Sequence, residues 1–189
     1  MNLKADRGAA TRERVLAIAT RLFAERGYDD TSIETVLQET GLSRGALYHH
    51  YAGKDALFEA VLEATESAIG ARIADAVRGV ADPAAALRTG ALAWIRLAGD
   101  PVIRRVVLID APSVLGWERW RAMEERYSFG MLKAALKAAG TVPREHLDVY
   151  AHMLLGAINE SALLVARGGA TATAEAAVED FLNRLLKTP

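Results

Sequence analysis

The feature that most constrains this chain of 189 residues is the stretch from Thr31 to Lys54, TSIETVLQETGLSRGALYHHYAGK. Apolar residues recur at helical spacing on both sides of a polar interruption, which predicts two short helices joined by a tight turn. Gly41 can adopt the left-handed conformation that ends a helix, and Ser43 suits the next N-cap. We also expect Thr31 and Glu34 to form a capping box at the start. A helix, a glycine-containing turn and a second helix place that second helix in the DNA major groove.

The exposed side of the second predicted helix has the chemistry of a DNA-reading surface. Arg44 can donate two parallel hydrogen bonds to a guanine edge, and Ala46 can contact a thymine methyl group. Tyr48 is placed to hold phosphate, which fixes register without reading sequence. Residues 41–54 contain no acidic residue, so this face is locally positive. The predicted DNA contacts are Thr31, Ser32, Ser43, Arg44, Gly45, Ala46, Tyr48, His49 and Lys54.

The run TSIETVLQETGLSRGALYHHYAGKDALFEAVL resembles the DNA-binding domain of TetR-family transcriptional repressors. The matching features are the T-[ST]-I opening, the G-[LV]-S-[RK]-G-x-L-Y-x-H-[FY] centre and the K-x-x-L-F continuation. Tyr51 stands where the family more often has Phe, which we expect to be a tolerated core change. The resemblance implies a homodimer that binds a palindromic operator in double-stranded DNA and is released by a small-molecule effector. The segments LIDAPSVLGWERW and LLGAINESALLVARGG resemble the regulatory domain of one branch of this family.

Composition favours helix and excludes several kinds of chemistry. Hydrophobic residues make up 51% of the chain and aromatic residues only 6%, with Ala and Leu in their place. The net charge is −1, so DNA affinity must come from the placement of charge rather than from its excess. The absence of cysteine excludes disulfides and thiolate metal sites. The N-terminus lacks the apolar run of a signal peptide, and no stretch approaches the ~20 continuous apolar residues of a membrane span. We therefore expect a cytoplasmic protein without a membrane partner.

The periodicity predicts an all-α protein in two parts: a three-helix DNA-binding domain with a helix-turn-helix at residues 1–53, and a helical-bundle ligand-binding and dimerisation domain at residues 54–189. A helix over residues 54–79 links the two. We expect residues 1–10 to be disordered, and a basic arm with Lys4 and Arg7 in the minor groove is the alternative. Further expectations are a first helix capped near Thr11, a break at residues 111–113 and a final helix capped by Thr173.

The last two predicted helices differ from the others because the first of them, ending near Ala166, is apolar nearly all round. A helix that is apolar on more than one face must be covered on more than one face, and the second cover can be another subunit. The pair resembles the final helices of TetR-family proteins, which implies a four-helix dimer interface. The predicted interface residues are Leu155, Ala162, Val178, Phe181, Leu182 and Leu185.

Polar and aromatic residues within the apolar C-terminal helices are candidates for an effector site. The aromatic side chains can wall a pocket for a flat apolar ligand, and Asn159 and Glu160 would be costly to bury without partners. Ordinary core packing explains the aromatic residues nearly as well, and Glu160 can instead pair with Arg104, Arg105 or a backbone group. The predicted effector contacts are Trp94, Arg104, Trp117, Trp120, Tyr127, Asn159 and Glu160.

The sequence offers little support for an enzyme, and no cofactor or metal is predicted. His146 and His152 are six residues apart, so they do not share a helix face as a metal pair would. The chain also lacks a glycine-rich phosphate loop and a nucleophile elbow. Two non-enzyme functions stay open beside a ligand-responsive repressor: a constitutive architectural DNA-binding protein with a filled C-terminal core, and a helical interaction module whose helix-turn-helix serves protein contacts.

Overall fold

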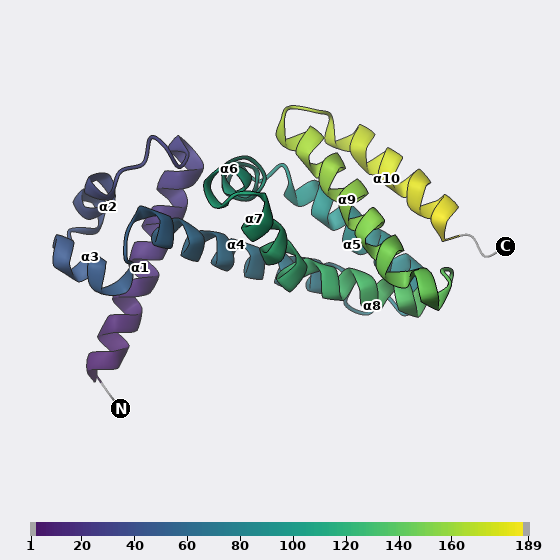
Figure 1. Ribbon diagram of the computed structural model, residues 1–189, viewed down its shortest axis with the longest axis horizontal. Coiled ribbons are helices and arrows are strands. Elements are labelled where there is room, and N and C mark those ends of the chain that lie inside the picture. The colour runs from purple at the N-terminus through teal and green to yellow at the C-terminus, as the bar shows by residue number, and fades with distance from the viewer. Residues whose placement is uncertain (1–2, 187–189) are drawn as a thin grey trace.

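The computed structural model describes the backbone of residues 3–186 and the side chains of residues 8–186, and every regular element in this range is helical (Figure 1). The predicted all-α class is confirmed. The N-terminal domain contains α1 (Leu3–Arg26), α2 (Ile33–Thr40) and α3 (Arg44–His50). The remaining elements are α4 (Lys54–Ala76), α5 (Pro83–Leu97), η1 (Ile103–Asp110), α6 (Ala111–Leu115), α7 (Trp117–Glu124), η2 (Glu125–Phe129), α8 (Gly130–Ala139), η3 (Arg144–His146), α9 (Leu147–Ala166) and α10 (Thr171–Leu185).

The helix-turn-helix forms where the sequence predicts it, with one change in its capping. Gly41 has φ +67° and its amide donates to the Leu37 carbonyl, which ends α2. Ser43 caps α3 by accepting a hydrogen bond of 3.2 Å from the Ala46 amide. The predicted capping box is wrong, because Ser32 caps α2. Thr31 is instead fully buried, and its hydroxyl donates to the Gly27 carbonyl at 2.7 Å.

The first helix begins earlier than the sequence suggests. Helix α1 starts at Leu3, so the predicted disorder is wrong for residues 3–10, and Thr11 lies inside the helix rather than at its cap. Residues 1 and 2 lie outside the described part of the chain. The same holds for the side chains of Lys4 and Arg7, so the suggested basic arm stays a prediction.

Helix α4 is shared by the two parts of the molecule. Its first turns carry Leu57 and Phe58, which are fully buried, and the Phe58 ring meets the Phe23 ring of α1 edge-on at 5.2 Å between centroids. Its second half packs against α5 in the C-terminal domain. In Figure 1 the helix extends out of the three-helix domain and along the length of the C-terminal domain. One continuous helix therefore contributes to the cores of both parts.

The middle of the C-terminal domain contains two π-helical segments. The predicted break at residues 111–113 is wrong, since α6 continues directly from η1 and Pro112 lies within this continuous helical run. The chain from Trp117 to Ala139 is helical throughout, with η2 joining α7 and α8. The predicted cap at Thr173 is also wrong, because α10 begins at Thr171 behind an Ala170 N-cap.

By length and composition alone, the segment Arg144–Ala166 is apolar enough to cross a membrane. In this fold 44% of that apolar window is buried inside the protein. Core helices of folded domains pass the same test, and α9 packs against α5, α8 and α10.

Candidate DNA-reading surface and effector cavity

The outer face of α3 presents most of the predicted DNA contacts together. Leu47 and Tyr51 are buried and fix the helix on the core of the domain. Arg44 forms an ion pair with Glu34 of α2, and both side chains are about 60% exposed. Because an exposed ion pair contributes little free energy, Arg44 can exchange this partner for another. Exposed residues of the predicted set are Ser32, Ser43, Arg44, Gly45, Tyr48 and His49, while Ala46 is half-buried.

Lys54 and Thr31 of the predicted set also have partners inside the protein. The Lys54 ammonium group lies 4.1 Å from the centre of the Tyr28 ring and donates to the Asp29 carbonyl at 3.2 Å. It is therefore oriented at the start of α4, beside the free amides of that helix end. Thr31 is a correction, since its buried side chain contributes no atom to the surface.

A partly buried contact joins the N-terminal domain to η1. The Asp110 carboxylate accepts a hydrogen bond of 2.7 Å from the Tyr28 backbone amide and one of 3.2 Å from Arg105 Nε. The Arg105 guanidinium lies against Gly27, whose φ of +83° and lack of a side chain permit the approach. The Tyr28 hydroxyl donates to Asp55 on α4. The pKa of Tyr28 is raised to about 12, mainly by burial and secondly by this hydrogen bond. No local sequence signal predicts this contact, because its partners lie far apart in the chain.

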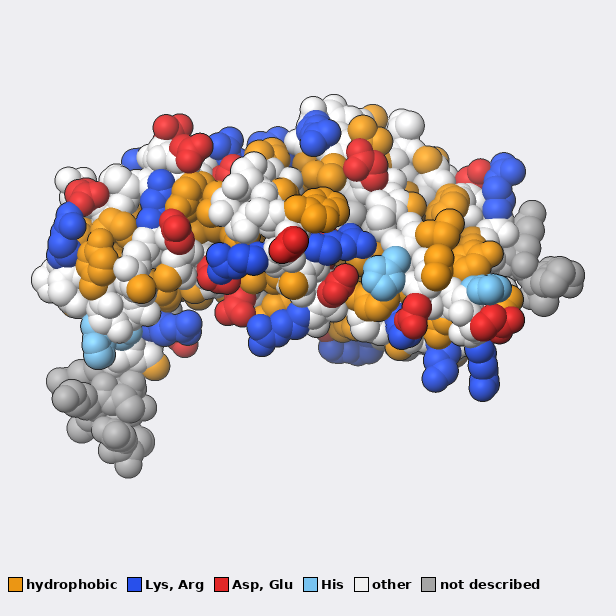
Figure 2. Space-filling model, viewed as in Figure 1, with side chains coloured by type: hydrophobic (Ala, Val, Ile, Leu, Met, Phe, Trp, Pro, Cys, Tyr) orange, Lys and Arg blue, Asp and Glu red, His pale blue; other side chains and the backbone are white. Residues whose placement is uncertain are grey.

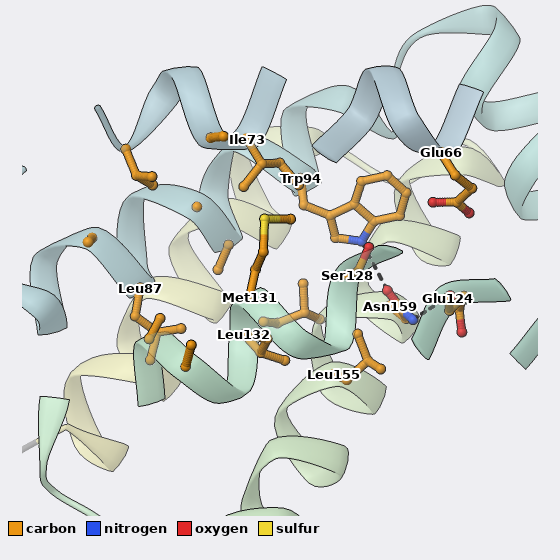
Figure 3. A pocket seen from close by; sticks show the side chains of 18 residues that line it. Glu66, Ile73, Leu87, Trp94, Glu124, Ser128, Met131, Leu132, Leu155 and Asn159 are labelled. Carbon is orange, nitrogen blue, oxygen red and sulfur yellow. Dashed lines mark hydrogen bonds between the residues drawn. The ribbon is translucent and has the colours of Figure 1, made fainter. Parts of the chain in front are cut away.

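The C-terminal domain contains a cavity of about 400 Å³ bounded by α4, α5, α7, η2, α8 and α9 (Figure 3). One end is apolar. Three of the lining residues on α4 and α8 are exposed, so the cavity reaches the surface between these helices: Ala74, Met131 and Ala134. The labelled apolar residues in Figure 3 are Ile73, Leu87, Met131, Leu132 and Leu155.

The other end of the cavity is polar and connected by hydrogen bonds. The Trp94 indole donates to the Asn159 amide oxygen at 3.1 Å, and the Asn159 amide nitrogen donates to Glu124 at 2.6 Å. Arg121 reaches the other Glu124 oxygen at 3.5 Å. Since one contact requires an acceptor on Asn159 and the other a donor, the two contacts together fix the orientation of its amide group.

A second carboxylate, that of Glu66 on α4, lines the same end (Figure 3). Its side chain is only 3% exposed, and it makes no hydrogen bond or ion pair within the described residues. Burial, reinforced by the charge of Glu124, raises the pKa of Glu66 to about 7. Burial also raises the pKa of Glu124 to about 7, although Arg121 and Asn159 act in the opposite direction.

The structure brings together only part of the predicted effector site. Trp94 and Asn159 line the cavity. Arg104, Trp117 and Glu160 are corrections because their side chains are exposed, Trp117 by 65%. Trp120 is buried and Tyr127 half-buried, but neither lines the cavity. Glu66 and Glu124 line it without having been predicted from the sequence.

Most of the predicted dimer residues are covered within one chain. Four of the predicted residues are buried within the chain, so these predictions are corrected: Leu155, Ala162, Val178 and Leu182. Leu155 also lines the cavity. Phe181 is 43% exposed, and Leu185 is half-buried. The large exposed apolar residues of α9 are Val149, Met153 and Leu164. Hydrophobic side chains are visible at the surface over this part of the C-terminal domain in Figure 2.

A helix-turn-helix domain joined by a shared helix to a cavity-bearing helical domain defines a class of transcriptional regulators. Residues 15–61 match the family model for bacterial regulatory proteins of the tetR family, and residues 84–189 match the tetracyclin repressor-like C-terminal domain. The second match alone covers more than half of the chain. The chain therefore belongs to the TetR family, whose members are transcriptional regulators and typically repressors.

Curated relatives match over part of the chain. The HTH-type transcriptional repressor Rv1474c of Mycobacterium tuberculosis is 48% identical over 56 residues, which cover 30% of each chain. The HTH-type transcriptional regulator LmrA of Bacillus subtilis is 42% identical over 76 residues, covering 39% of this chain and 40% of LmrA. The aligned segments thus span well under half of these relatives.

Solved structures match along nearly the whole chain. A TetR-family transcriptional regulator from Pectobacterium atrosepticum is 30% identical with a TM-score of 0.76, covering 96% of this chain and 94% of that one. RolR in complex with resorcinol is 17% identical with a TM-score of 0.71, covering 98% and 97% of the two chains. At this identity the likeness to RolR shows the fold alone.

Proposed function

We propose that this protein is a ligand-responsive repressor that binds a palindromic operator as a homodimer and leaves it when a small molecule occupies the cavity. One observation carries the proposal. Helix α4 contributes Leu57 and Phe58 to the core under the DNA-reading surface, and Glu66 and Ile73 to the cavity wall. A ligand that displaces the second half of α4 must therefore also act on the domain that contains α3. As an operator-binding repressor, the protein acts in the cytoplasm.

The dimer would form through the apolar face that α9 and α10 leave uncovered. Val149, Met153 and Leu164 are each more than half exposed, and they recur along one side of α9. Phe181 of α10 is also exposed. A dimer built on this face would hold two copies of α3 in a fixed relation, which is what a palindromic operator requires.

Release requires the ligand to favour one conformation over the other. A ligand shifts the equilibrium only by the difference between its affinities for the DNA-competent state and the released state. The contact of Tyr28 and Arg105 with Asp110 is a second route for this coupling, because it fixes η1 to the loop after α1. The constitutive architectural alternative assumes a filled C-terminal core, and a cavity of about 400 Å³ argues against it. The resorcinol complex of RolR supports a ligand-binding role for the shared fold.

The experiment begins with selection of random DNA duplexes by the full-length protein. The expected product is a near-palindrome with half-sites about one helical turn apart, or a multiple of that spacing. A panel of small amines, alcohols and carboxylic acids is then tested for binding by thermal shift and for operator release by gel mobility. The Ala135→Phe variant fills the cavity and is expected to keep operator binding but to lose ligand release. Selection without an enriched sequence, or ligands that bind the cavity and leave operator affinity unchanged, would reject the proposal.

A further inference from the structure

Three glutamates follow one side of α4, at positions 59, 63 and 66. The first two are paired with arginines of neighbouring helices: Glu59 with Arg119 at 2.7 Å and Glu63 with Arg126 at 3.2 Å. Glu66 breaks this series. It lines the cavity, is 97% buried and has no hydrogen-bonding or ion-pair partner in the described part of the chain.

The polar end of the cavity carries more negative than positive charge. Glu124 shares the site with Glu66, and only Arg121 approaches either of them with a positive charge. The 18 lining residues include two glutamates and no lysine, arginine or histidine. Arg121 is the one positive charge beside Glu124 and also lies 3.9 Å from Glu125, so with both carboxylates ionised at least one negative charge is left uncompensated. A buried charge without a partner is costly, and the missing partner is one positive charge.

We propose that the cavity selects an amphiphilic monocation, an amine or quaternary ammonium compound with an apolar body. Its cationic nitrogen would lie between Glu66 and Glu124 beside the Trp94 indole, the aromatic ring that attracts cations most strongly. Its apolar body would extend along Ile73 and Leu87 toward the opening between α4 and α8. This inference rests on the proposed function, because it names the chemical class of the effector. A carboxylate ligand would meet like charge, and a neutral one would leave the buried charge uncompensated.

The position of Glu66 gives such a ligand an action on the DNA-binding domain. A cation held by both carboxylates connects Glu66 of the link helix α4 to Glu124, the last residue of α7. Without a ligand the two ionised carboxylates repel each other. A cation attracts both, and so changes the preferred distance between α4 and α7. A neutral ligand in the apolar end makes no such connection.

Binding of a permanent cation should strengthen as pH rises from about 6 to about 8, because the burial that raises the pKa of both glutamates keeps them partly protonated below neutrality. Other groups around them are few. Trp94, Ser128 and Asn159 are neutral, and Arg121 stays charged. Glu125 lies beside Glu124, and the His152 ring lies 3.7 Å from the Glu125 carboxylate. A His152→Gln variant is therefore the control for any contribution of this histidine to the pH dependence of binding.

The test uses four probes with the same apolar body: phenylbutylamine, phenylbutyltrimethylammonium, phenylbutanol and phenylbutyrate. Calorimetry on the full-length protein should give both cations at least about tenfold tighter binding than the alcohol, with the carboxylate weakest. Glu66→Gln and Glu124→Gln should each remove most of this preference while leaving alcohol binding intact. Glu63→Gln, one turn away on the same helix and paired outside the cavity, should have no effect. Circular dichroism checks that each variant is folded.

Three results would overturn the inference: equal or tighter binding of the alcohol or the carboxylate by the unmodified protein, no binding of any probe, or the same loss in Glu63→Gln as in Glu66→Gln. Operator release separates this inference from the proposed function. Cations that bind through Glu66 without releasing operator would leave the selectivity standing and reject the sensor role. Operator release by the alcohol or the carboxylate, without a preference for cations, would support the sensor role and reject the cation selectivity.

Discussion

The backbone amide of Tyr28 donates a 2.7 Å hydrogen bond to the carboxylate of Asp110, which lies 82 residues away in the chain. Tyr28 follows the left-handed Gly27 at the end of α1, and Asp110 is the last residue of η1. The Tyr28 ring also packs on Phe23 and Phe58, at 6.0 and 5.1 Å between centroids. One residue thus contacts the core of the DNA-binding domain, the link helix α4 and a segment of the C-terminal domain.

Substitution of Asp110 should weaken both stability and coupling. Asp110→Ala removes the acceptor for the partly buried Tyr28 amide and the partner of Arg105, so the free energy of unfolding should fall by about 1–3 kcal/mol. Asp110→Asn keeps an acceptor for the amide and should lose less. Urea denaturation gives the stability, and operator affinity with and without ligand gives the coupling. The exposed Asp75→Ala, which removes the partner of Arg78, is the control and should change neither quantity. Equal behaviour of Asp110→Ala and Asp75→Ala would show that the contact has no coupling role.

Arg44 and Lys54 should differ in what they recognise. Arg44→Ala is expected to relax sequence preference at one position of each half-site and to cost about 1–3 kcal/mol of binding free energy. Lys54→Ala should weaken binding to all sequences alike and reduce the salt dependence, since a phosphate contact carries no sequence information. Binding to operator variants over a range of salt concentrations measures both effects. If Lys54→Ala alters sequence preference and Arg44→Ala does not, these roles are reversed.

The helix-turn-helix was predictable because its signals are local. Gly41 and Ser43 act on backbone groups within a few residues of themselves, so their roles can be inferred without tertiary structure. Thr31 shows the limit of this inference. Threonine and serine at positions 31 and 32 have nearly the same capping chemistry, and only the packing of Thr31 against the end of α1 leaves the cap to Ser32.

The cavity was less predictable because it is built from several helices whose packing the sequence does not specify. Trp94 and Asn159 were found because a polar or aromatic group on an apolar helix is conspicuous by itself. Glu66 had the same signal, since Leu62 and Ile69 place it on the buried face of α4. The prediction for Trp117 is wrong because this large apolar side chain lies at the surface, although its apolar character alone would favour burial. Most predicted dimer contacts are wrong for a similar reason. Apolar periodicity indicates which positions are buried, but it does not indicate whether the same chain or a second subunit buries them.

Disruption of the exposed apolar face of α9 should produce monomers that remain folded. Leu164→Glu places a charge at a side chain that is 57% exposed in one chain, so the fold should tolerate it while a dimer interface would not. Leu182→Glu is the matched contrast, because Leu182 is fully buried and its substitution should unfold the domain. Sedimentation reports the oligomeric state and circular dichroism reports the fold. A dimer that persists in Leu164→Glu, Met153→Glu and Phe181→Glu would mean that another surface forms the dimer.

The buried carboxylate of Glu66 should make the protein less stable as pH rises. Its pKa is about 7 in the folded protein and 4.5 as the ordinary value, so between these two pH values the unfolded chain binds fewer protons than the folded one. Folding stability therefore falls as pH increases from 4.5 to about 7 and changes little from this group outside that window. The shift corresponds to about 3 kcal/mol at pH above the window.

Glu66→Gln tests this directly, because the amide has nearly the same shape and does not ionise. The variant should match the unmodified protein in free energy of unfolding near pH 4.5 and exceed it by up to about 3 kcal/mol near pH 8. Glu63→Gln, whose side chain is 43% exposed and paired with Arg126, should show little change at either pH. Urea titrations at both pH values supply the four comparisons. A Glu66→Gln protein that is destabilised at high pH would mean that the ionised carboxylate has a stabilising partner, and the unpaired charge on which cation selection depends would not exist.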